Sequence, residues 1–195
     1  MGPENPDSQR FRGPVLDSHV LAHARHCVIT FEELRALGLS ASGIDHRVRT
    51  GRLHRKYSGI FAVGRPDLPL DGVFLAAVRA CGPKAKLGLL SALRKYGLRA
   101  GGTYRIDVIA PRSIKPKKGI RLHRPLSLDA LDTTIVDDIP ITTVAQTLLD
   151  VSAPKYRLNI GKLLHEAAVQ QLLDMRAIWE VLARQPNHPL SLIHI

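Results

Sequence analysis

The most constraining part of this sequence is residues 30–64, because its helix caps, glycines and short connections allow few arrangements. Thr30, with a glutamate three residues later, forms a capping box, and Ser40 is a second N-cap residue. Only "GLS" separates the two helices that these caps predict. The segments "RLHRK" and "IFAVG" then flank "YSG", so we expect a tight hairpin with Gly59 at positive φ.

An earlier helical segment, residues 16–26, completes the order helix, helix, helix, hairpin. This is the layout of a winged helix-turn-helix, in which the second helix of the pair enters the DNA major groove. Further helices are expected over residues 70–81, 87–97, 156–169 and 174–184 and in "TTVAQTLLDVSA". Strands are expected in "TYRIDVIAP", "GIRLHRP", "TTIV" and "IPIT", with a hairpin turn at Asp137 and Asp138.

The sequence therefore predicts an α+β protein: an N-terminal winged helix-turn-helix, a small mixed α/β domain and C-terminal helices. The composition supplies enough apolar residues for such cores. The expected division is a disordered arm at 1–15, a DNA-binding domain at 16–65, an α/β domain at 66–153, a helical segment at 154–189 and a tail at 190–195.

The net charge of +11 points to a polyanionic partner, which could be nucleic acid, an anionic membrane or an acidic protein. Cys27 and Cys81 are too isolated to form a disulfide framework or a metal knuckle. The N-terminal segment has no apolar core of a secretory signal, and no apolar run has the length of a membrane span. We expect a cytoplasmic protein without a membrane partner.

Double-stranded DNA is the expected partner of residues 40–65, which hold six basic residues and one acidic residue. On a helical wheel Ile44 and Val48 define the buried side of the third helix, which turns its polar residues outward. Arginine pairs with guanine through two hydrogen bonds, and a wing runs beside phosphates. The expected DNA-binding residues are Ser42, His46, Arg47, Arg49, Thr50, Arg52, His54, Arg55, Lys56 and Tyr57. The alternative is a merely solvated basic face.

A second basic run extends from residue 112 to residue 124 and contains no acidic residue. Its basic members are Arg112, Lys115, Lys117, Lys118, Arg121 and Arg124. A solvated loop, a second phosphate-binding patch and a docking site for an acidic partner protein all fit this pattern.

No pattern of catalytic residues is evident. His19, His23 and His26 have helical spacing but lack a third-ligand motif, so a helix surface is the simpler interpretation. Asp107 lies in an expected strand without the second acid and lysine that a nuclease needs. We expect neither a metal nor a cofactor, and no enzymatic activity.

Residues 20–152 resemble the AbiEi-type antitoxin family of type IV toxin–antitoxin systems. The resemblance rests on "VITFEELRALGLSASGIDHRVRTGRLHRKYSGIFAVG", "AAVRACGPKAKL", "GIRLHRP" and "DDIPITTVAQTLLD". It implies a bacterial transcriptional regulator whose winged helix binds its own promoter. It also implies an antitoxin-like α/β domain that helps bind DNA or neutralises a nucleotidyltransferase-like toxin.

The sequence departs from the family pattern at "GLLSALRKYGL", which lacks the histidine and first serine of the usual helix. Many relatives continue into a domain resembling very-short-patch-repair (Vsr-like) endonucleases, whereas this sequence reads "LSLIHI" after residue 189. We interpret that hexapeptide as an artefactual tail, since it resembles a translated transposon end used in sequencing libraries. The alternative function is the DNA-targeting half of such an endonuclease, and RNA binding is a weaker third hypothesis.

Overall fold

The structure is a computed structural model that describes residues 14–99, 105–111, 113–124 and 128–185. The chain forms two compact units, Met1–Ala80 and Cys81–Ile195. Over the described residues the fold is α+β, with eight α-helices, a three-stranded antiparallel sheet and a five-stranded mixed sheet. The expected fold class is thus confirmed.

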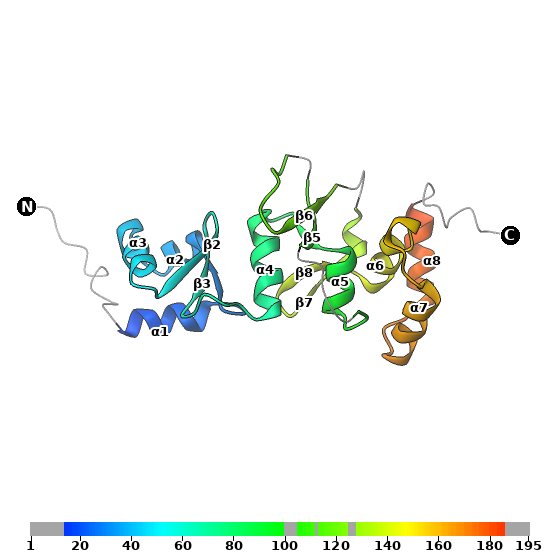
Figure 1. The fold of residues 1–195 in the computed structure, drawn as a ribbon, viewed down its shortest axis with the longest axis horizontal. Helices are drawn as coiled ribbons and strands as arrows, with labels where there is room; N and C mark the ends of the chain where they lie inside the picture. Colours follow the sequence, from blue (N-terminus) through cyan, green and yellow to red (C-terminus); the bar gives the residue numbers. More distant parts are fainter. Residues whose placement is uncertain (1–13, 100–104, 112, 125–127, 186–195) are drawn as a thin grey trace, which may run out of the picture. The chain divides into compact units, whose positions relative to one another are not determined.

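The first unit has the element order that the sequence predicts, with one additional strand (Figure 1). Its elements are α1 (Pro14–His23), β1 (Val28–Thr30), α2 (Phe31–Ala36), α3 (Ala41–Arg49), β2 (Leu53–Tyr57), β3 (Ile60–Val63) and α4 (Leu70–Ala80). Helices α2 and α3 with the hairpin β2–β3 form the winged helix-turn-helix. The capping box is present in full: the Thr30 hydroxyl accepts from the Glu33 amide at 3.1 Å, and the Glu33 carboxylate accepts from the Thr30 amide at 2.8 Å.

The wing is a hairpin whose turn depends on glycine. Gly59 has φ +71°, as expected for the residue that closes the β2–β3 turn. Strand β3 lies between β1 and β2, and all of its residues are buried. The register between β2 and β3 shifts after Arg55, so that Lys56 is the extra residue of a bulge.

Helix α4 belongs to the first unit, whereas the expected domain boundary after residue 65 placed residues 66–80 in the second domain. It contacts all three strands β1, β2 and β3, and Phe74 on it is fully buried. A Cβ at Gly72 would stand 2.5 Å from the backbone oxygen of His26, so this close approach requires glycine. The apolar side of α4 is buried against these strands, and this burial explains why the helix belongs to the first unit.

The second unit is built on a sheet with strand order β6-β5-β4-β8-β7. Its strands are β4 (Lys86–Leu87), β5 (Ile106–Ile109), β6 (Ile120–His123), β7 (Thr133–Val136) and β8 (Ile139–Thr142). Strand β5 runs parallel to β6, β4 runs parallel to β8, and the other two pairings are antiparallel. Asp137 and Asp138 both have positive φ at the β7–β8 turn, which confirms the expected hairpin.

Helices complete the second unit and form one apolar cluster with part of the sheet. They are α5 (Leu89–Lys95), α6 (Val144–Val151), α7 (Ile160–Val169) and α8 (Met175–Arg184), with short 3-10 turns η2 (Ala130–Asp132) and η3 (Pro154–Tyr156). Helix α6 contacts α5, α7 and α8, so it is the central helix of this cluster. The Thr143 hydroxyl accepts from the Gln146 amide at 3.2 Å, as the expected cap of α6 requires.

Candidate nucleic-acid interface

The orientation of α3 follows from two apolar residues four positions apart. Ile44 is fully buried and Val48 is partly buried in the core of the first unit. The Ser40 hydroxyl accepts from the Gly43 amide at 3.0 Å and fixes the start of the helix. These contacts anchor one side of α3, so the opposite side faces solvent.

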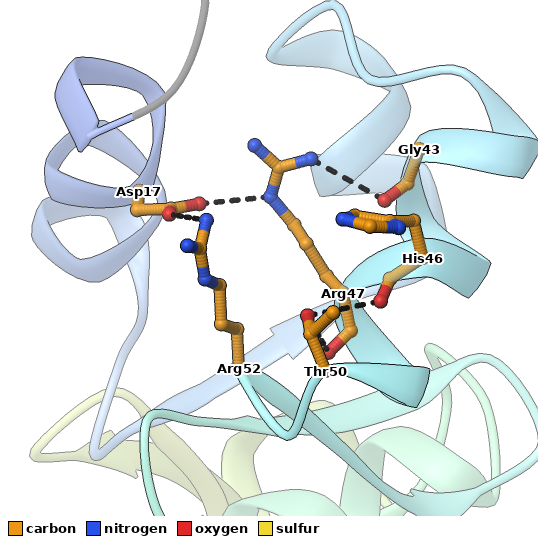
Figure 2. A network of polar contacts seen from close by, with 6 residues as sticks. All are labelled: Asp17, Gly43, His46, Arg47, Thr50 and Arg52. Atoms are coloured by element: carbon orange, nitrogen blue, oxygen red, sulfur yellow. Dashed lines mark hydrogen bonds and ion pairs between the residues drawn. The ribbon is translucent and has the colours of Figure 1, made fainter.

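Four of the expected DNA-binding residues lie on that solvent side of α3. Their side chains are exposed: Ser42, His46, Arg49 and Thr50. The Thr50 hydroxyl donates to the His46 carbonyl at 3.0 Å and thereby finishes the last turn of the helix (Figure 2). Arg49 therefore presents a guanidinium to solvent from the part of the molecule that resembles a recognition helix.

Arg47 has a different environment from the other expected residues of α3. Its side chain is only 11% exposed, and its Nε donates to Oδ1 of Asp17 on α1 at 2.8 Å. One terminal nitrogen also donates to the Gly43 carbonyl at 3.3 Å (Figure 2). Arg47 thus ties α3 to α1, and its guanidinium is already engaged within the protein.

The wing carries three exposed basic residues, each with its own surroundings. Arg52 donates from Nη1 to Oδ2 of Asp17 at 2.6 Å, so one carboxylate binds two arginines. Arg55 lies over the Phe61 ring at 5.1 Å from its centre, and one of its terminal nitrogens lies 3.9 Å from Oδ1 of Asp45, which is too long for a hydrogen bond. Lys56 is exposed at the bulge of β2. Arg55 and Lys56 therefore form the outer basic edge of the hairpin.

His54 and Tyr57, also expected at the interface, are only partly exposed. The Nε2 atom of His54 is buried and has no hydrogen-bond partner among the described residues. This atom is therefore directed away from solvent, in contrast to the guanidinium of Arg49.

The second basic run is divided by the structure into exposed and internally paired residues. Lys115, Lys118 and Arg124 are exposed, and Lys117 is partly exposed. Arg124 also donates a hydrogen bond to the Ile114 carbonyl at 3.0 Å. Arg121 on β6 approaches the buried carboxylate of Asp107 on β5 at 3.6 Å. Arg112 lies outside the described residues.

Asp107 has partners that the sequence did not reveal. Its Oδ1 lies 2.8 Å from Nε2 of His123 on β6. In the parallel pairing of β5 with β6, His123 lies opposite Ile109, two residues after Asp107. No three His, Cys, Asp or Glu side chains within the described part of the chain are grouped so as to hold a metal ion. The observed role of Asp107 is to pair internally with His123 and Arg121.

Two further acidic residues of the second unit each have one carboxylate oxygen that is buried without a hydrogen-bond partner among the described residues. Asp132 is fully buried and accepts a hydrogen bond from the Arg184 guanidinium on α8, which raises the pKa of Arg184. Burial raises the pKa of Asp150 to about 6, although its hydrogen bond from Gln146 at 2.7 Å lowers it in part. Both residues belong to the packing of α6 and α8 rather than to the basic surface.

Sequence reasoning did not identify Asp17 as part of the site. It is separated from Arg47 by 30 positions and from Arg52 by 35, so no local pattern joins them. The only signal was an isolated acid at the start of a helix in a basic region, which ordinarily indicates favourable interaction with the helix dipole.

The fold is similar to a solved structure, the RV2827C protein from Mycobacterium tuberculosis. The two chains share 17% identity with a TM-score of 0.55, and the match covers 91% of this chain and 74% of that chain. No protein-family model and no curated protein sequence matches this chain. The similarity therefore establishes a shared fold.

None of the helices within the described ranges has both the length and the apolar character needed to cross a membrane.

Proposed function

We propose that this chain is a DNA-binding transcriptional regulator of the antitoxin type, with α3 as the recognition helix and β2–β3 as the wing. The observation that carries the proposal is the exposure of Arg49 on the side of α3 opposite Ile44. A guanidinium there is free of the core and has the fork that pairs with guanine O6 and N7. Arg55 and Lys56 add charge where a wing meets phosphates.

The resemblance to AbiEi-type antitoxins supplies the finer part of the proposal. We expect the preferred DNA to lie near the gene for this chain and a nucleotidyltransferase-like toxin to be the protein partner. Lys115, Lys118 and Arg124 are each exposed on the second unit and offer positive charge to either DNA or an acidic toxin. Binding assays with DNA and with the product of a neighbouring toxin gene, each with these three residues changed to alanine, distinguish the two uses.

The first test of DNA binding is a selection from a random duplex library, followed by titration of the selected duplex. Arg49→Ala should weaken binding to the selected duplex by about 1–3 kcal/mol, because it removes one base-reading guanidinium. Arg176→Ala is the matched control, since it removes an 88% exposed arginine from α8 of the other unit. Equal affinities for wild type, Arg49→Ala and the control would contradict the assignment of α3 as recognition helix.

The wing should contribute affinity without sequence preference. Arg55→Ala combined with Lys56→Ala removes two exposed cations, and each phosphate contact steepens the plot of log K against log salt by ~0.9. We expect the double variant to flatten that slope by about 2 and to weaken selected and unrelated duplexes equally. Fluorescence anisotropy across a salt series measures both quantities. Loss of discrimination at an unchanged slope would mean that the wing reads bases instead.

A further inference from the structure

Asp17 connects three elements of the first unit through a single carboxylate. Its Oδ1 accepts from Arg47 Nε at 2.8 Å and its Oδ2 accepts from Arg52 Nη1 at 2.6 Å (Figure 2). Arg47 lies in the last turn of α3, and Arg52 immediately precedes β2. The carboxylate on α1 therefore holds the end of the recognition helix and the start of the wing at one point.

The two arginines are held to different degrees. Arg47 is 11% exposed and also donates to Gly43, so it is fixed along α3. The Arg52 side chain is 56% exposed and lies on the wall of a surface hollow of about 440 Å³. Arg52 is therefore exposed but paired with Asp17, so it can meet an anion only when that pair is broken, whereas Arg47 is withdrawn from solvent altogether.

This arrangement affects selective and unselective DNA binding in opposite ways. The nonspecific affinity for DNA increases with the number of cations that reach phosphates, because each contact releases counterions. Selective binding instead needs α3 to be held at a fixed orientation to the base edges. A carboxylate that engages Arg47 and Arg52 keeps these cations from phosphates and so reduces the affinity for unrelated DNA. Because it also fixes the end of α3, it favours binding to the preferred sequence.

We propose that Asp17 is a positioning residue that sets the DNA selectivity of this surface by fixing α3 to the wing and by withholding Arg47 and Arg52 from phosphates. This inference rests on the proposed DNA-binding function. It assigns a function to α1, which lies outside the helix-turn-helix pair itself.

The test uses the full chain, the duplex selected by the wild-type protein and an unrelated duplex of equal length. Asp17→Asn should reduce the ratio of the two affinities on the order of tenfold, since it loosens α3 and frees cations. It should also steepen the salt slope for the unrelated duplex by ~0.9 for each arginine released. In the double variant Asp17→Asn/Arg52→Ala the slope for the unrelated duplex should be ~0.9 less steep than in Asp17→Asn, because one of the released cations has been removed.

Glu32→Gln is the matched control, because Glu32 is an exposed acid on α2 of the same unit. It adds the same net charge and should change both affinities equally, leaving their ratio unaltered. The inference would be overturned if Asp17→Asn left the ratio of the two affinities unaltered, or if Glu32→Gln lowered that ratio as much as Asp17→Asn does. Wild-type protein that selects no duplex would instead overturn the proposed function on which it rests.

A second variant keeps the inference testable if Asp17→Asn lowers the folded fraction seen by circular dichroism. Arg52→Gln leaves the Asp17–Arg47 pair in place and removes only the cation that Asp17 holds at the wing. Its salt slope should match that of the wild type, because a withheld cation contributes no phosphate contact. A slope flattened by the full ~0.9 would show that Arg52 already binds phosphate and would overturn the withholding role.

Discussion

Replacing Arg184 with methionine should lower the free energy of unfolding of the second unit by about 3–5 kcal/mol. Asp132 is fully buried and the Arg184 guanidinium donates to it, so the variant leaves a buried carboxylate without its countercharge. Urea unfolding followed by tryptophan fluorescence measures the loss, since Trp179 is the single tryptophan and lies on α8.

Two comparisons separate the buried pair from a general effect of changing α8. Arg176→Met breaks the exposed Arg176–Glu180 pair on the same helix and should cost less than about 1 kcal/mol. Asp132→Leu combined with Arg184→Met should recover most of the lost stability, because it removes the buried charge together with its partner. A similar loss in Arg176→Met and Arg184→Met would show that burial of Asp132 does not decide the effect.

Asp150→Asn should stabilise the second unit at pH 7.5 by as much as about 3 kcal/mol and have little effect at pH 4. Burial raises the pKa of Asp150 to about 6, against about 3.9 for an aspartate in the unfolded chain. Between these two values the folded protein binds more protons than the unfolded chain, so stability falls as the pH rises from about 4 to about 6. Above about pH 6 the folded protein bears the full loss of stability that comes from ionising Asp150, and the uncharged asparagine avoids this loss.

Urea titrations at a series of pH values measure this difference between wild type and Asp150→Asn. The hydrogen bond from Gln146 to Oδ1 at 2.7 Å has an equivalent acceptor in asparagine, so the variant preserves that contact. Glu180→Gln on the exposed side of α8 is the control and should not change the pH dependence. If the free energies of unfolding of wild type and Asp150→Asn changed in parallel across pH 4–7.5, the raised pKa of Asp150 would be contradicted.

Local signals in the sequence predicted the parts of the fold that local physics determines. The capping box at Thr30, the cap at Ser40 and the turn at Gly59 each depend on residues within four positions of one another. The strands β1 and β4 were missed because they have three and two residues and depend on distant pairing partners. The helix expected over residues 16–26 ends at His23, since His26 and Cys27 turn the chain at positive φ without a glycine to signal it.

The candidate site was predictable in its outline but not in its internal pairing. Periodicity placed Ile44 inward and Arg49 outward, and the structure confirms both positions. Periodicity could not distinguish Arg47 from Arg49, because the difference arises from Asp17 on another helix. Whether these residues bind DNA stays a prediction for the titrations described above.

The close approach of α4 to the turn at His26 determines where the first unit can be separated from the rest of the chain. A fragment that stops at residue 65 would lack the helix that contacts β1, β2 and β3 and would expose their apolar surface to water. A fragment spanning residues 14–80 retains this cover together with Gly72. The latter is therefore the suitable piece for isotope labelling and for crystallisation with short duplexes.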